Sequence, residues 1–377
     1  MKRLAFVLLA ACGSDPTTPS PDAAPLPHEL GMNDVSVLVP LPADLSAPVV
    51  ATLFDPPLLD DTWMQLAVFT KGDLGSQQDD PYDRNSFQIT AVRFDICDRA
   101  TIGPCAAGTD GRLRLVAQPI VIASDGTTIQ ALDVGVHLFY PIPAADLQTV
   151  LTTLRTLRPA PTATALAISD GDAAYFARLR TLVRKYARPD NLVRITANGQ
   201  KALAVGSTWG FREFDRQSDG SFVQTQIPNA NGIEQDILLQ GGDVTYSSAN
   251  PIQDVPAGFQ ADVLGGVFGM LSAEDKAAAV DAIAQAENPT LHDTVDTQCI
   301  ACHVGTYIGA YRASEIGLDP KALPSWFTSS FDTTVPAQAD GRRIRGFGYF
   351  AREPIISQRV ANETANVLDE ISARFTF

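Results

Sequence analysis

The sequence has no cluster of basic residues beyond short pairs such as Arg342 and Arg343. Its 28 lysines and arginines are outnumbered by 43 acidic residues, which gives a formal net charge of -15 at pH 7. Because a protein binds a polyanion through a basic patch that displaces counterions, we do not expect nucleic acid as a partner. A Gly-x-Ser-x-Gly motif and a phosphate-binding loop are also missing, so nothing points to a serine hydrolase or a nucleotide-hydrolysing enzyme.

The N-terminus lacks an apolar run long enough to cross a bilayer as a helix. Its apolar run, residues 4–11, follows Lys2 and Arg3 and is only eight residues long. A basic start before a short apolar run is typical of an export signal. At 377 residues, with 45% apolar and 19% charged residues, the chain has the composition of a globular protein large enough for more than one domain.

The end of this run has a recognisable pattern. Residues 9–12, LAAC, resemble the lipobox of bacterial lipoproteins, in which the signal is cut before a cysteine that then carries lipid. The resemblance implies a signal peptide over residues 1–11, a lipid anchor on Cys12 and a place in the cell envelope. Gly13, where an aspartate would retain the protein at the inner membrane, favours the outer membrane, with the membrane face left open. An ordinary secretory signal with an incidental Cys12 is the alternative.

Composition and periodicity predict an α+β fold. Residues 12–33 are rich in Pro, Ser, Asp and Ala and are expected to be a flexible tether. Alternating or β-branched runs separated by turn residues predict two β-rich, sandwich-like regions, at 34–160 with a C-terminal helix and at 168–255 with a helix first. Residues 256–377 are expected to be mainly helical. The expected helices lie within residues 143–159, 169–190, 272–289 and 357–375.

The chain has five cysteines, and two of them, Cys97 and Cys105, lie eight positions apart with no other cysteine or histidine nearby. An exported protein meets an oxidising compartment, so we expect these two to form a disulfide. Closing so short a loop would stabilise the fold by roughly 2.5 kcal/mol on the chain-entropy estimate. A redox-active or metal-binding pair is the alternative reading.

Two further cysteines belong to the stretch DTQCIACHVG, residues 296–305. Cys299, Cys302 and His303 form a Cys-x-x-Cys-His pattern that resembles the haem-attachment site of c-type cytochromes. The resemblance covers this short segment alone. It implies one covalent haem c, held by thioether bonds to the two cysteines, with His303 as the proximal iron ligand, within a haem-binding region at 256–377.

Other readings of this segment remain open. His292, Cys299, Cys302 and His303 offer a zinc ligand set, although consecutive ligands at positions 302 and 303 strain a tetrahedron. A thioredoxin-like dithiol would follow a strand of a βαβ unit, which is not predicted here. Either reading would make the protein a structural or binding lipoprotein in which a zinc ion or a dithiol stabilises the C-terminal segment.

The second axial ligand has to come from upstream, because no histidine or methionine follows His303. We expect His292, since the seven residues to Cys299 can span roughly 20 Å when extended and so pass around the macrocycle. Core packing is the expected role of His137, and an open sixth position is a further alternative. The remaining upstream candidates are Met270, His137 and Met64, with His28 and Met32 discounted as tether residues.

These expectations describe a membrane-anchored, mono-haem c-type cytochrome that passes single electrons to a redox partner protein in the bacterial cell envelope. A dihaem peroxidase would need two attachment motifs, and the sequence contains a single Cys-x-x-Cys-His motif. We therefore expect an electron carrier rather than an enzyme. Arg342, Arg343 and Arg345 are candidates to pair with the haem propionates.

Overall fold

The computed structural model describes most of the body of the chain. The described residues are 25–42, 87–97, 108–132, 134–201, 207–227, 233–242, 245–251, 268–292, 299–319, 327–335 and 346–377. The helices are α1 (Met32–Val35), α4 (Ala144–Leu154), α5 (Ala173–Tyr186), α7 (Ala273–Ala286), α8 (Cys299–Glu315) and α9 (Gln358–Arg374), with short 3-10 turns at Pro189–Asn191 and Phe268–Met270. The strands are β1 (Ser36–Leu38), β2 (Phe87–Ile96), β3 (Thr109–Ile122), β4 (Ile129–Ala131), β5 (Val134–Pro143), β6 (Arg194–Lys201), β7 (Ser207–Arg216), β8 (Phe222–Gln224), β9 (Glu234–Gly242), β10 (Thr245–Pro251), β11 (Phe347–Phe350) and β12 (Glu353–Ile356).

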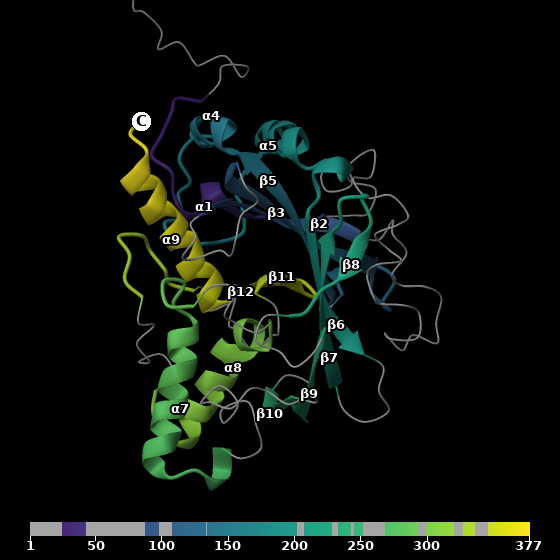
Figure 1. Cartoon of the computed structure of the whole chain (residues 1–377), viewed down its shortest axis with the longest axis vertical. Coiled ribbons are helices and arrows are strands. Elements are labelled where there is room, and N and C mark those ends of the chain that lie inside the picture. Colours follow the sequence, from purple (N-terminus) through teal and green to yellow (C-terminus); the bar gives the residue numbers. More distant parts are fainter. Residues whose placement is uncertain are drawn as a thin grey trace, which may run out of the picture.

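In the described part of the chain, one antiparallel sheet of ten strands dominates and, with the helices, confirms the α+β class (Figure 1). Its main path is β1-β2-β3-β5-β6-β7-β9-β10, with β4 paired to β3 and β8 to β7. The two β-rich regions were expected to be sandwich-like, but β5 pairs with β6 and joins them into this one sheet. Periodicity identifies strands without showing which strands pair, so the sequence could not distinguish the two arrangements.

α5 and α7 lie within the expected ranges 169–190 and 272–289, and each begins directly after a capping residue. The carboxylate of Asp172 accepts a hydrogen bond from the backbone N–H of Tyr175 at 2.7 Å and so caps α5. The hydroxyl of Ser272 accepts one from the N–H of Asp275 at 3.1 Å and caps α7. Each side chain satisfies one of the backbone donors that a helix leaves unpaired at its first turn.

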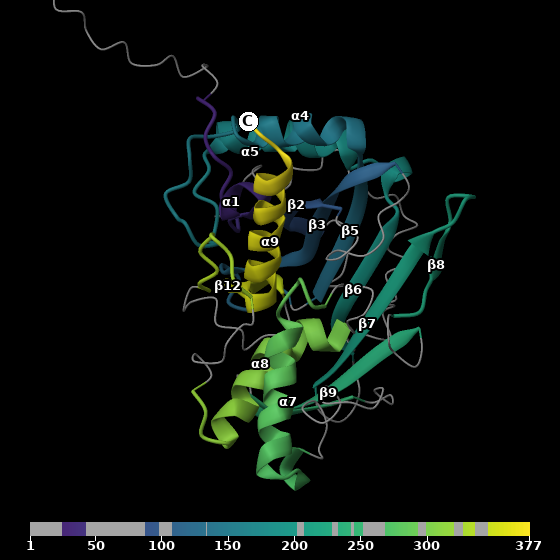
Figure 2. The same ribbon diagram turned by 60° about the vertical axis from the view of Figure 1, so that its left-hand side comes forward.

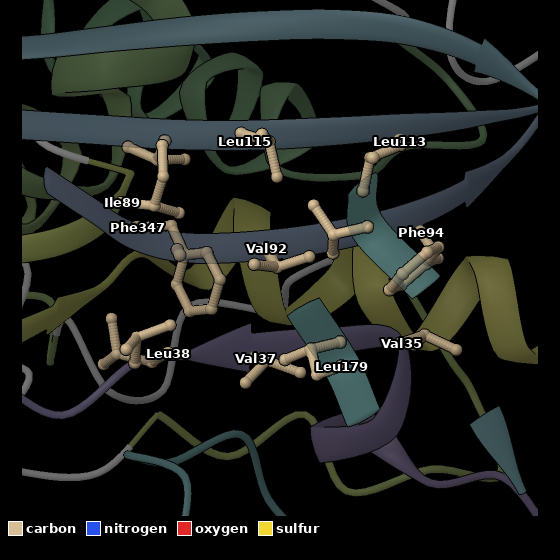
Figure 3. Close-up of a cluster of buried hydrophobic side chains, with 14 of the residues drawn as sticks. Val35, Val37, Leu38, Ile89, Val92, Phe94, Leu113, Leu115, Leu179 and Phe347 are labelled. Atoms are coloured by element: carbon tan, nitrogen blue, oxygen red, sulfur yellow. The ribbon is translucent and has the colours of Figure 1, made fainter. Parts of the chain in front are cut away.

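The apolar face of the sheet forms the core (Figure 3). Val92 of β2 and Leu113 and Leu115 of β3 point into this cluster, where Leu179 of α5 and Val37 of β1 meet them. Because side chains alternate along a strand, the residues between these positions face the other side of the sheet. That side of the sheet carries arginines, and α8 and the first turns of α9 lie over it.

The folded body begins earlier than the tether expectation placed it. Met32 is only 1% exposed and Leu30 is buried, and both belong to the core. His28 also lies in this segment, where its Nε2 is 3.0 Å from a carboxylate oxygen of Asp34. Residues 28–33, the end of the expected tether, therefore pack on the body, because burying Leu30 and Met32 contributes more than the Pro- and Ser-rich composition suggested, whereas Leu26 is 86% exposed. None of the helices in the described part of the chain is long and apolar enough to cross a membrane.

Two C-terminal helices, α8 and α9, lie against the sheet (Figure 2). α8 contacts α7, α9, β9 and β10, while α9 contacts α1 and β2. The β11–β12 hairpin lies between them in the sequence and contacts β2, β3 and β4. The first turn of α8 and the first turns of α9 thus meet over the central strands.

Candidate functional site

The polar face of the sheet is assembled by strand register. Across the central strands, Val116 of β3 lies opposite His137 of β5, and His137 lies opposite Thr196 of β6. In the adjacent row, Arg114 of β3 lies opposite Phe139 of β5. Residues two positions apart on one strand share a face, so both rows point to the same side. The sheet therefore places a histidine in the centre of a polar surface.

The first turn of α8 covers this surface. Cys299 and His303 are four positions apart, so they lie on one side of the helix. The His303 ring is 5.2 Å from the Phe211 ring of β7 and 6.0 Å from the His137 ring of β5, both measured between centroids. The Cys-x-x-Cys-His segment is thereby packed against the sheet.

A pocket lies between α8, the first turns of α9 and the sheet. We call it the arginine pocket, because arginines from four strands and one helix surround it. It is lined by Arg93, Arg112, Arg114, Val116, His137, Phe139, Arg194, Thr196, Ala197, Asn198, Phe211, Arg212, Glu213, Cys299, His303, Gly346, Phe347, Ser357, Arg359, Val360 and Glu363, and it encloses about 130 Å³.

Two carboxylates bind several of these arginines at one wall of the pocket. Glu363 of α9 accepts hydrogen bonds from Arg93 at 2.9 Å and from Arg359 at 2.8 Å. Asp95 of β2 accepts one from Arg114 at 2.9 Å and lies 3.4 Å from a guanidinium nitrogen of Arg93. All of these side chains are nearly excluded from solvent. The network ties α9 to β2 and β3.

The arginines keep both carboxylates charged. Burial raises the pKa of Glu363, but the positive charges of Arg359 and Arg93 outweigh it and hold the pKa well below its ordinary value. Burial likewise raises the pKa of Asp95, and there the charges of Arg114 and Arg93 prevail and lower it. Both groups are carboxylates at neutral pH.

The positive charge of Arg112 is less well balanced by carboxylates than the charges of the neighbouring arginines. Its nearest carboxylate oxygen, on Asp95, is 3.7 Å away, and its buried Nε and Nη2 find no hydrogen-bond partner within the described structure. Burial, followed by the repulsion of Arg114, lowers the pKa of Arg112 to about 9. Since a guanidinium does not release its proton in a protein, the lowered pKa measures a buried positive charge that an anionic group would stabilise.

Arg194 forms the opposite wall. Its guanidinium donates two hydrogen bonds to the carboxylate of Asp215, at 2.6 and 3.0 Å, and lies 3.2 Å from Glu213. Burial opposes the charge on Arg194, but Asp215, Glu213 and Cys299 together raise its pKa. Burial raises the pKa of Glu213, an effect that Arg194 only partly offsets. Cys299 and Arg194 both line the pocket.

The residues predicted from the sequence are brought together only in part. Cys299 and His303 line the arginine pocket, whereas the side chain of Cys302 lies outside the described part. His292 is not among the residues that line the pocket, and its backbone carbonyl accepts a hydrogen bond from Arg359 at 2.6 Å. Met270 is 78% exposed. Among the described residues, no group of three or more His, Cys, Asp or Glu is arranged to hold a metal ion.

The other predicted cysteine sites fall at the edge of the described structure or beyond it. Cys97 follows β2, where its backbone N–H donates to the carbonyl of Asp110 at 2.8 Å. Cys105 and Cys12 lie outside the described residues, as do the signal segment and Met64. The Cys97–Cys105 disulfide and the lipid anchor therefore stay predictions.

Sequence reasoning missed most of the pocket. The arginines expected to pair with propionates, at 342, 343 and 345, lie outside the described residues, and those that line the pocket come from elsewhere. A signal was present in the strands GRLRLV and AVRFDI, where charged residues alternate with apolar ones. Such alternation predicts a polar face, but it does not show that a helix buries that face.

Comparisons of the chain with protein families, with curated proteins and with solved structures gave no significant match. The Cys-x-x-Cys-His motif and the geometry of the pocket are therefore the observations that bear on function.

Proposed function

We propose that this protein is a mono-haem c-type cytochrome that transfers single electrons in the bacterial cell envelope. The observation that carries the proposal is the position of the Cys-x-x-Cys-His segment. It forms the first turn of α8, and its Cys299 and His303 both face a buried cationic pocket. A zinc ion or disulfide that only stabilised the fold would not need a pocket lined by arginines.

The residues of α8 would hold the macrocycle. The thiols of Cys299 and Cys302 would each add across one vinyl group, forming a carbon–sulfur bond while the thiol hydrogen moves to the neighbouring vinyl carbon. His303, next in the chain, would bind the iron. Bound in this way, haem c supplies a one-electron iron couple.

The charge of the pocket fits a group that carries two carboxylates, as haem does. Six arginines and two glutamates line it, in a chain whose formal net charge is -15. Arg112 is buried, and its Nε and Nη2 make no hydrogen bond within the described structure. A propionate beside Arg112 would complete these hydrogen bonds and stabilise its charge.

The size of the pocket sets a condition on this fit. The free space of about 130 Å³ is bounded by long arginine side chains from the sheet and from α9. Loading would move these long side chains outward, while the spacing of the His137 and His303 rings across the pocket is kept. Arginines can do this while keeping their hydrophobic stems packed.

The proposed location follows from the N-terminus. A lipid on Cys12 would hold the protein on a membrane, where a redox partner protein would reach the body. A Cys12→Ala variant would then be released into the soluble envelope fraction. A variant that stays with the membranes would contradict the anchor.

Haem attachment tests the proposal directly. The protein should be produced in cells that mature c-type cytochromes and compared with a Cys299→Ser/Cys302→Ser double variant. We expect the parent protein to retain haem after denaturation, to give a c-type pyridine haemochrome and to titrate as a one-electron couple. The double variant should lose covalent haem entirely.

A control variant at the neighbouring position keeps the motif intact. Ile300→Val changes a residue between the two cysteines, and it should attach haem as the parent does. A parent protein that comes out colourless, or that releases its haem on denaturation, would refute the proposed function.

A further inference from the structure

We propose that His137 of β5 is the second axial ligand of the haem iron, on the side opposite His303. The inference rests on the proposed function and adds to it a ligand that comes from the sheet, in a different part of the chain. It replaces His292, the ligand expected from the sequence.

The distance between the two imidazole rings carries the inference. Their centroids are 6.0 Å apart. A metal–nitrogen bond of about 2 Å puts the centroid of a bound imidazole about 3 Å from the metal, so two such rings on opposite sides of one iron are separated by about 6 Å. The 33° angle between the rings is compatible with this arrangement, because each ring can rotate about its metal–nitrogen bond.

The position of His137 on β5 supports a ligand role over a packing role. Its neighbours Val136 and Leu138 are fully buried in the apolar core, whereas His137 points to the other face and is only partly buried. It lines the arginine pocket together with His303. β5 is hydrogen-bonded to β3 on one side and to β6 on the other, so the histidine stands on a rigid strand.

The other candidate ligands in the described structure lie elsewhere. His292 does not line the pocket, and the highly exposed Met270 does not either. His28 lies beside Asp34 near the start of the body, and Met32 is buried in the core. Of the described histidines and methionines, His137 and His303 are the two that the pocket brings together.

This ligation has a functional consequence. Two histidine ligands leave no open iron position for peroxide or other small ligands, so the centre would serve electron transfer. A histidine pair also gives a lower reduction potential than a histidine–methionine pair, because methionine ligation raises the potential.

Three variants of the haem-loaded protein test the assignment, with electron paramagnetic resonance, optical spectra and carbon monoxide binding as readouts. We expect the parent protein to be low-spin and six-coordinate. His137→Ala should become high-spin, and its reduced form should bind carbon monoxide at least tenfold more tightly. His137→Met should stay low-spin with a higher reduction potential. His292→Ala is the matched control and should behave as the parent.

The outcomes separate the inference from the proposed function. A His137→Ala protein that carries covalent haem and stays low-spin would overturn the inference while leaving the proposed function intact, and a high-spin His292→Ala protein would do the same. If His137→Ala does not fold, His137→Met decides, because an unchanged reduction potential in that variant also overturns the inference. Absence of covalent haem from the parent would remove the proposed function and the ligand together.

Discussion

The balance of charge in the arginine pocket is decided by single residues. Four guanidinium groups, on Arg93, Arg112, Arg114 and Arg359, share the carboxylates of Asp95 and Glu363. Inside a protein, a charge that loses its partner costs far more than one at the surface. The consequence of removing a charge therefore depends on which partner remains.

Glu363→Gln leaves Arg93 and Arg359 without their shared carboxylate. Because both guanidinium groups are buried, we expect the free energy of unfolding to fall by about 3–5 kcal/mol, measured by denaturant titration. Asp190→Asn is the control, since Asp190 pairs with Arg188 at the surface, where its side chain is 72% exposed. That change should cost less than about 1 kcal/mol. Equal losses in the two variants would show that the network does not stabilise the fold.

Arg112→Met should have the opposite effect in the haem-free protein. It removes a buried charge whose Nε and Nη2 make no hydrogen bond within the described structure, so we expect the free energy of unfolding to stay the same or to rise. Arg93→Met is the matched comparison. It would remove the guanidinium that lies 2.9 Å from Glu363 and 3.4 Å from Asp95, and it should therefore lower the free energy of unfolding. The prediction fails if Arg112→Met is the more damaging of the two.

The same network predicts acid sensitivity. The pKa values of Asp95 and Glu363 are lower in the folded protein than their ordinary values of 3.8 and 4.5. The stability that these groups contribute is therefore fully present above about pH 5 and is lost as the pH falls through their folded pKa values. Unfolding free energies measured from pH 7 to pH 3 should drop at the acid end, and less steeply in Glu363→Gln. Parallel curves for the two proteins would contradict this prediction.

Residues of the pocket could be identified from the sequence only where the spacing is itself the signal. Cys299 and His303 belong to a local pattern, and the structure places both at the pocket. His137 stands in an apolar run, where a core role was the natural prediction, and the pairing of β5 with β3 and β6 decides its environment. Such pairings connect residues distant in the sequence, and one sequence carries no direct sign of them.

Among the structural elements, β11 shows how the pocket is closed. Phe347 of β11 lines the pocket, and the strand is held by the fully buried side chain of Gln118 on β3. The side-chain oxygen of Gln118 accepts a hydrogen bond from the N–H of Tyr349 at 2.8 Å, and its amide donates to the Tyr349 carbonyl at 2.9 Å. The side chain of Gln118 thus makes the two hydrogen bonds to the backbone of β11 that a neighbouring strand would otherwise make.

Gln118→Leu would leave the N–H and carbonyl of Tyr349 buried without these partners. Each unpaired group costs about 1–3 kcal/mol, so we expect the free energy of unfolding to fall by about 2–5 kcal/mol in a denaturant titration. Gln217→Leu, at an exposed position after β7, should change it by less than about 0.5 kcal/mol. A Gln118→Leu protein as stable as the control would show that β11 is not held by this side chain.

Helices were more predictable than the sheet. α5 and α7 begin directly after their capping residues, Asp172 and Ser272, because a cap and the turn that follows it are local. The expected sandwich depended instead on long-range pairing, and β5–β6 pairing produced one sheet. The join between the two β-rich regions was therefore the part of the fold that local sequence signals could not supply.

Across the whole molecule, the sheet has one apolar face and one face that carries arginines, and the Cys-x-x-Cys-His turn of α8 lies over the arginine-bearing face. The sheet contributes His137 and most of the arginines, while α8 contributes Cys299 and His303. A macrocycle held between them would connect the β-rich part of the chain to its C-terminal helices. The β-rich regions would then be part of the haem site.

A mass spectrum of the peptide that contains residues 299–303 tests the central claim most directly. The protein should be isolated from cells that mature c-type cytochromes, denatured and digested before measurement. The account predicts that this peptide carries the mass of one haem through Cys299 and Cys302. A peptide with two unmodified thiols, or with the two sulfurs bridged to each other, would contradict it.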